Sequence, residues 1–171
     1  MTTIINGSSP SITFSDNTTQ TSGYGAGTSQ FVSSQMPTGS VLQVVNATYS
    51  TTVTNSTNTL ADTGLTATIT PKFSTSKILV IVHHPVRVNT GQIARFFLNR
   101  AGTNIVQLWQ GWGYISAMSA QLSTTYLDSP ATTSATIYKT QFANPSATGV
   151  VYVSPDGSSD LSTITLMEIA A

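Results

Sequence analysis

The feature that most constrains this chain is a series of short segments in which apolar and hydroxyl-bearing side chains alternate with a period of two. Residues 65–69 (Leu-Thr-Ala-Thr-Ile) show the alternation most clearly, and it is typical of a strand with one buried face. Turn-forming residues recur roughly every 8–15 residues, and no segment has the helical period of about 3.6 residues together with caps. The sequence therefore predicts an all-β fold with a single β-sandwich or jelly-roll-like domain.

Two local patterns predict details of this fold. Residues 77–82 form a mostly aliphatic run, which is typical of a central strand covered on both faces. Pro85 follows this run, and because proline lacks an amide hydrogen we expect the end of the strand to lie at a sheet edge or a bulge. Residues 100–103 (Arg-Ala-Gly-Thr) separate two further strand candidates, which predicts a hairpin with Gly102 at a positive φ.

The first forty residues differ in composition from the rest of the chain. Glycine, serine, threonine, asparagine and glutamine dominate them, and such a segment cannot bury enough apolar surface to fold alone. We therefore predict an extended N-terminal attachment arm over residues 1–40 and a head over residues 41–171. The apolar residues of the arm that we expect to contact neighbouring chains are Ile4, Ile5, Ile12 and Phe14.

Charged side chains are scarce. Only 7% of the residues are Asp, Glu, Lys or Arg, against roughly 25% in ordinary domains, and six basic residues balance six acidic ones. Because there is no basic stripe, we expect neither nucleic acid nor an anionic membrane as a partner. No apolar run approaches the roughly 18 residues of a membrane span. Charge-poor, hydroxyl-rich strands suit a protein fixed in a large assembly, although a threonine-rich β surface alone gives the same composition.

Side chains with catalytic or metal-binding chemistry are few. The chain has no cysteine, and a regular strand would point the adjacent His83 and His84 to opposite faces, so only symmetry-related copies of one histidine could share a metal ion. No serine lies in a Gly-x-Ser-x-Gly motif. Most carboxylates sit in turn contexts, where aspartate is common for backbone reasons. The carboxylates considered for glycoside cleavage or calcium binding are Asp62, Asp128, Asp156, Asp160 and Glu168. We expect no enzyme activity, no cofactor and no metal ion.

The stretch of residues 109–114 is the most specific functional hint. It places Trp109, Trp112 and Tyr114 within six residues, with glycines between them. Aromatic rings so close together can form a stacking platform for a sugar ring. They can equally close one end of a sandwich core or anchor a contact between subunits. Both interpretations stay open at this point.

Several segments resemble a β-module that is common in tail-fibre and virion proteins of marine and cyanobacterial phages. The similar segments are residues 11–20, 39–45, 65–71, 76–80, 126–139 and 162–169. They are spread over most of the chain. The resemblance implies a β-sandwich that usually assembles as a homotrimer and has no catalytic residues.

The resemblance leads us to expect a structural protein on the surface of a tailed bacteriophage virion. Its expected partners are further copies of itself and other virion proteins, which the arm would contact. The chain lacks the long shaft of a complete fibre, and an arm with one sandwich is also how a capsid decoration (cement) protein is built. The alternative function is that of a receptor-binding module in which Trp109, Trp112 and Tyr114 hold a host surface glycan.

Overall fold

The computed structural model describes residues 4–5, 12–13, 19–20 and 36–171. The chain divides into two compact units, Met1–Gln35 and Met36–Ala171, which we call the N-terminal unit and the head. Residues 36–40, which the sequence analysis placed in the arm, belong to the head.

The N-terminal unit contains three described strands of two residues each: β1 (Ile4–Ile5), β2 (Ile12–Thr13) and β3 (Thr19–Gln20). They form an antiparallel sheet in the order β1-β2-β3. The side chains of the predicted contact residues Ile4, Ile5 and Ile12, and the whole of Phe14, lie outside the described residues. So does the predicted extended course of the arm between these strands.

The head consists of antiparallel strands, and the helix described in it is the short 3-10 helix η2 (Gly157–Ser159). The strands are β4 (Val41–Tyr49), β5 (Val53–Asn55), β6 (Ala61–Ile69), β7 (Lys77–Val88), β8 (Gln92–Arg100), β9 (Thr103–Gly113), β10 (Met118–Asp128), β11 (Thr136–Ala143), β12 (Val151–Val153) and β13 (Ser162–Ile169). Within the described part of the chain, no helix is long and apolar enough to cross a membrane.

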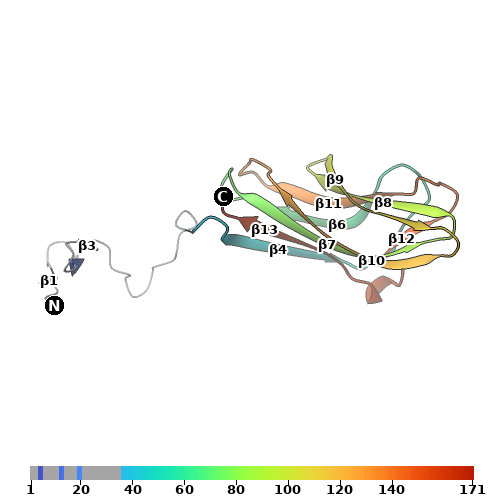
Figure 1. Cartoon of the computed structure of the whole chain (residues 1–171), viewed down its shortest axis with the longest axis horizontal. Coiled ribbons are helices and arrows are strands. Elements are labelled where there is room, and N and C mark those ends of the chain that lie inside the picture. Colours follow the sequence, from blue (N-terminus) through green and yellow to red (C-terminus); the bar gives the residue numbers. More distant parts are fainter. Residues whose placement is uncertain (1–3, 6–11, 14–18, 21–35) are drawn as a thin grey trace. The chain divides into compact units, whose positions relative to one another are not determined.

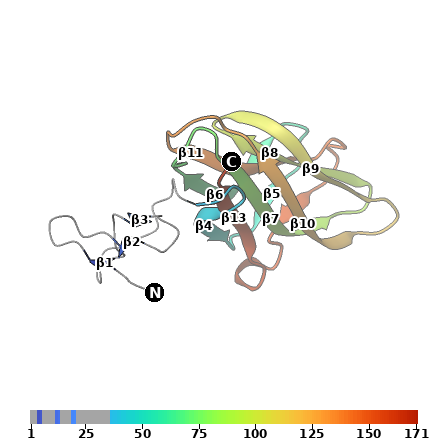
Figure 2. The same cartoon turned by 60° about the vertical axis from the view of Figure 1, so that its left-hand side comes forward.

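The strands of the head form two sheets that pack face to face, which confirms the predicted all-β sandwich. The larger sheet has the order β4-β13-β7-β12-β5, and β10 pairs with the other side of β7. The smaller sheet has the order β6-β11-β8-β9 (Figure 1). Figure 2 shows the two layers, with β11 and β8 in one and β13, β7 and β10 in the other.

The core lies between the sheets and consists of the inward-pointing alternate residues of the strands. In β6, Leu65, Ala67 and Ile69 are buried, while the residues between them are exposed. This is the period-two pattern from which the strand was predicted. Among the larger core side chains, the rings of Phe96 and Phe142 stack with their centroids 5.5 Å apart.

The hairpin between β8 and β9 confirms its prediction. Arg100 pairs with Thr103, and between them Ala101 and Gly102 have φ values of 48° and 92°. Two consecutive residues with positive φ define the two-residue turn whose twist matches that of the flanking strands. Glycine at the second position adopts this conformation without the steric cost of a Cβ atom.

The prediction that Pro85 marks a sheet edge or a bulge is wrong. β7 continues through Pro85, which lies opposite Gln121 of β10. On its other side, β7 pairs with β13 up to His83 and with β12 from Val86. The missing amide hydrogen of Pro85 therefore falls where one neighbouring strand ends and the next begins, so the ladder tolerates a proline in a central strand. The carbonyl of Pro85 still accepts a hydrogen bond from the Ser154 amide at 2.9 Å.

The beginning and the end of the head lie side by side. The Gly39 amide donates to the Ala170 carbonyl at 2.8 Å, and the Ala170 amide donates to the Ser40 carbonyl at 2.9 Å. The chain therefore enters the head, at Met36, beside the strand end at which the head finishes. We call this the entry end of the head.

Candidate functional site

The three aromatic residues singled out in the sequence separate into two environments. Trp109 is half-buried and packs against the core, with its ring edge-on to Phe96 at a centroid distance of 5.8 Å. Trp112 and Tyr114 are 56% and 78% exposed. The structure thus places Trp109 in the sandwich and the other two aromatic side chains on the surface.

The two glycines of this stretch explain how Trp109 fits into the sandwich. Gly111 and Gly113 occupy inward-facing positions of β9, on the same side of the strand as Trp109. A Cβ atom on Gly111 would collide with the Trp109 indole ring, and one on Gly113 would collide with the carbonyl oxygens of Val88 and Asn89. The glycines therefore leave room for the indole and let β9 lie close to the chain that follows β7.

Trp112 and Tyr114 lie beside a cavity of about 270 Å³. Trp112 is held on the surface of the smaller sheet by the pairing of β9 with β8, which sets it opposite Ile93. The residues lining the cavity are Gly91, Gln92, Ile93, Trp112, Tyr114 and Ser146. None of these residues is Asp, Glu, Lys, Arg or His, so the cavity suits an uncharged ligand. We call the exposed Trp112, Tyr114 and Ile115, together with this cavity, the aromatic tip.

Side-chain amides form hydrogen bonds in the wall of the cavity. The Asn144 amide donates to the Gln92 Oε1 at 2.8 Å, and the Gln92 Nε2 donates to the Thr148 hydroxyl at 2.9 Å.

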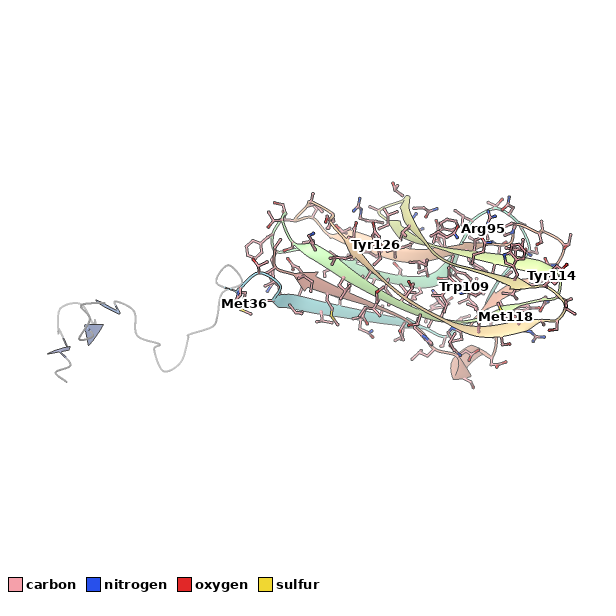
Figure 3. All side chains as sticks on the ribbon, in the orientation of Figure 1. Met36, Arg95, Trp109, Tyr114, Met118 and Tyr126 are labelled. Atoms are coloured by element: carbon pink, nitrogen blue, oxygen red, sulfur yellow. The ribbon has the colours of Figure 1, made fainter. Side chains whose placement is uncertain are left out.

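Figure 3 shows that Tyr114 lies at the end of the head opposite Met36. The aromatic tip is therefore at the far end of the head from the point where the chain enters it.

A chain of five hydrogen-bonded side chains crosses the core from one sheet to the other. Thr63 bonds to Thr140 at 2.5 Å, Thr140 to the His84 Nε2 at 2.9 Å, the His84 Nδ1 to Ser162 at 2.7 Å, and Ser162 to Ser154 at 3.0 Å. All five residues are buried. Burial, and to a smaller extent the neighbouring His83, lowers the pKa of His84 to about 3. The imidazole is therefore neutral at physiological pH, and its two nitrogens join the two sheets.

The pair formed by Ser162 and His84 has the atom separation of a serine nucleophile and its base, but not the surroundings of one. Both side chains are fully buried, so a substrate cannot reach the hydroxyl. The second imidazole nitrogen bonds to a threonine, where a serine hydrolase uses a carboxylate to orient the base. An imidazole that protonates only near pH 3 is also a weak base at neutral pH.

Asp128 is the centre of a partly buried cluster. Its two carboxylate oxygens accept hydrogen bonds from the Arg100 Nη1 at 2.7 and 2.8 Å, and one of them also accepts from the Tyr138 hydroxyl at 2.6 Å. Burial and the hydrogen bond to Asp128 raise the pKa of Tyr138. The hydrogen bond to Asp128 likewise raises the pKa of Arg100. Asp128 was predicted to be a turn carboxylate, and no sequence pattern indicated this cluster, because its members come from the three strands β8, β10 and β11.

Glu168 is fully buried in β13. Its carboxylate accepts hydrogen bonds from the Gln43 Nε2 at 2.6 Å and from the backbone amides of Lys72 and Phe73 at 2.7 and 3.4 Å. Burial raises the pKa of Glu168, but the hydrogen bonds, led by that from Gln43, outweigh this effect and hold the pKa below its usual range. Glu168 thus joins the turn that precedes β7 to the edge of the larger sheet.

The remaining carboxylates lie in two further places. Asp62 contacts Lys139 at 2.8 Å and accepts from Gln141 at 2.6 Å on the smaller sheet. Asp156 and Asp160 border a second cavity of about 240 Å³, and the Asp160 carboxylate accepts a hydrogen bond from the Asp156 amide at 3.1 Å. Among the described residues, no three histidine or carboxylate side chains gather closely enough to hold a metal ion.

No protein-family model matches this chain, and no curated protein matches it either. Any function assigned to it therefore rests on its residues, on the resemblance of its segments to a phage β-module, and on the geometry described above.

Proposed function

We propose that the chain is a non-enzymatic structural protein on the surface of a tailed bacteriophage virion, of the tail-fibre or the capsid-decorating type. In this proposal, the N-terminal unit, residues 1–35, attaches it to other virion proteins. The observation that carries the proposal is that the head has two different ends. The chain enters the head at Met36, and the exposed aromatic side chains lie at the opposite end. A module with this polarity can be held at one end while the other end faces outward.

The state of the reactive side chains supports a structural role. Asp128 and Glu168 are buried and hydrogen-bonded within the fold, and His84 is buried between two hydroxyl groups. Asp62 is engaged by Lys139 on the sheet surface. These four groups stabilise the sandwich, and none of them forms an open pair of nucleophile and base.

The proposal predicts that the chain is a stoichiometric component of purified phage particles. Quantitative mass spectrometry of gradient-purified particles, with an isotope-labelled copy of the chain as standard, counts the copies per particle. Dozens of copies would assign it to a fibre, and hundreds, following the symmetry of the shell, would assign it to capsid decoration. If the chain is absent from particles that are otherwise complete, the proposal is wrong.

The aromatic tip favours a second candidate function, the binding of a neutral saccharide of the host surface. Two exposed aromatic side chains beside an uncharged cavity provide stacking surface without a charged partner. The cavity, at about 270 Å³, is near the lower end of the roughly 300–1,000 Å³ found for small-molecule sites. This candidate is compatible with the first, because a virion protein can carry a receptor site on its outer end.

Replacement of both exposed aromatic residues tests the saccharide candidate. We expect the double variant Trp112→Ala/Tyr114→Ala to weaken binding tenfold or more, or about 1.4 kcal/mol, because the stacking surface is lost. Binding of the full chain is measured on an array of neutral and acidic saccharides and then by calorimetry on the best neutral one. The control is Ile137→Ala, a residue that is 49% exposed on β11. Equal binding by the double variant and the control, or no binding by the wild type, would contradict this candidate.

A further inference from the structure

An apolar row crosses the outer face of the larger sheet, the face turned away from the core. The pairing registers set Val44 of β4 opposite Met167 of β13, Met167 opposite Leu79 of β7, and Leu79 opposite Leu127 of β10. Directly opposed residues of antiparallel strands share one face, with their Cβ atoms about 5 Å apart. The two ends of the row, Val44 and Leu127, are 55% and 50% exposed. The four side chains therefore form a continuous apolar surface across four strands.

A second row extends this surface towards the entry end of the head. Val41 lies opposite Ile169, and Ile169 lies opposite Lys77. We call Val41, Val44, Leu79, Leu127, Met167 and Ile169 the outer patch. Lys77 is the charged residue within these two rows, and neither row contains a carboxylate.

On the side away from the entry end, the rows beyond the outer patch are mainly polar, with Ile81 as the apolar member of the first row. The next row along the strands consists of Asn46, Thr165, Ile81 and Thr125. The row after it consists of Thr48, Thr163, His83 and Ser123. An apolar centre bordered by uncharged polar groups is the usual anatomy of a protein interface.

The outer face of the smaller sheet is built differently, although it belongs to the same charge-poor chain. There, Asn99 donates to Gln141 at 3.3 Å, Gln141 donates to Asp62 at 2.6 Å, and Arg95 donates to Gln110 at 3.1 Å. This ladder of amides and charges suits a face in contact with water. The same face also carries the exposed Trp112 and Ile137. The two outer faces therefore differ in arrangement, because only in the larger sheet do the described registers place four apolar side chains in one unbroken row across four strands.

We propose that a second copy of this chain covers the outer patch. This proposal rests on the proposed function only in placing the contact on a virion. The charges favour this occupant: the chain has no net charge, so copies do not repel one another. A strongly acidic or basic partner would find only Lys77 beside the patch, and no carboxylate in its two rows, to pair with. The patch also lies at the entry end, near the strand ends that the hydrogen bonds between Gly39, Ser40 and Ala170 join.

The size of the face sets the strength of this contact. Four strands about 4.8 Å apart and four rows about 6.8 Å apart cover on the order of 500 Å² of flat area. A stable complex buries about 800 Å² per partner. We therefore expect association that depends on concentration in solution and that becomes strong when anchoring raises the local concentration of the heads.

A charge in the outer patch tests the proposal. Sedimentation equilibrium of the purified full chain should give a mass at least twice the 18.0 kDa of one copy as the concentration rises. Leu127→Asp should weaken association tenfold or more, because a carboxylate would be buried without a partner. The matched control is Ile137→Asp, which is 49% exposed on the smaller sheet, as Leu127 is 50% exposed on the larger one. The control should associate like the wild type.

Three results would overturn the proposal. The first is a wild-type chain that stays at 18.0 kDa at every concentration. The second is a Leu127→Asp variant that associates like the wild type, which would place the contact elsewhere, and the third is an equal loss in Ile137→Asp. Because these measurements use the isolated chain, failure here leaves the proposed virion function standing. Conversely, absence of the chain from particles does not alter the sedimentation result.

Discussion

Lowering the pH from 7.5 to 4.5 is expected to reduce the free energy of unfolding by about 3 kcal/mol through His84 alone. Its pKa is about 3 in the folded chain and about 6.5 in the unfolded chain. The unfolded state therefore takes up a proton first as the pH falls. The contribution of His84 to stability is complete above pH 6.5 and is lost progressively towards pH 3, at about 1.4 kcal/mol per pH unit between these values.

Urea unfolding of the full chain at closely spaced pH values measures this dependence. His84→Gln should flatten the dependence between pH 6.5 and pH 5, because a glutamine offers hydrogen bonds to Thr140 and Ser162 but does not titrate. His83→Gln serves as the matched control and should keep most of the slope, because burial is the larger cause of the lowered pKa of His84 and His83 the smaller one. A wild-type stability that is constant over this range, or a slope that persists in His84→Gln, would show that His84 is not held neutral in the core.

Removal of the buried carboxylate of Glu168 is expected to destabilise the chain by about 3 kcal/mol. Glu168→Ala removes the hydrogen bonds that the carboxylate accepts from the Lys72 amide and from the Gln43 side chain, and a hydrogen bond to a charged group contributes about 1.5–3 kcal/mol. Glu168→Gln keeps one acceptor oxygen in place and should lose about half as much. Urea unfolding at pH 7 measures both variants. A loss below about 1 kcal/mol in Glu168→Ala would show that the turn around Lys72 does not depend on this carboxylate.

The pH dependence of the Glu168 effect has a definite sign. The pKa of Glu168 is held below its usual value of 4.5, so the folded state favours the ionised form. Its contribution is present above pH 4.5 and is lost as the pH falls through the lower pKa of the folded chain. The difference between the wild type and Glu168→Gln should therefore shrink below pH 4. Between pH 6.5 and pH 4.5, the slope expected from His84 remains separate from this effect.

Local patterns in the sequence were sufficient for the fold class. The alternation in residues 65–69 predicted β6, and Gly102 predicted the turn between β8 and β9, because both signals depend only on neighbouring residues. Pro85 misled the prediction, since its place in a central strand depends on where β13 ends and β12 begins. The order of strands in a sheet is a long-range property that residue spacing does not contain.

The candidate site was predictable in part. Residues three apart on a strand point to opposite faces, so the spacing of Trp109 and Trp112 could have separated the core aromatic from the surface one. The bonds of His84 to Ser162 and Thr140 join residues 78 and 56 positions apart, and no local pattern indicates them. The outer patch likewise becomes visible only when the registers of four strands are known.

The most direct test of the virion function compares how many copies of two forms of the chain remain on purified particles. The two forms are the full chain and residues 36–171, which contain the whole described core of the sandwich. Particles that lack the endogenous chain are incubated with either form, purified again, and analysed by quantitative mass spectrometry. We predict that the full chain stays on the particles in a fixed number of copies and that the isolated head does not. Retention of the isolated head at the same copy number, or of neither form, would contradict attachment of this protein to a virion through its N-terminal segment.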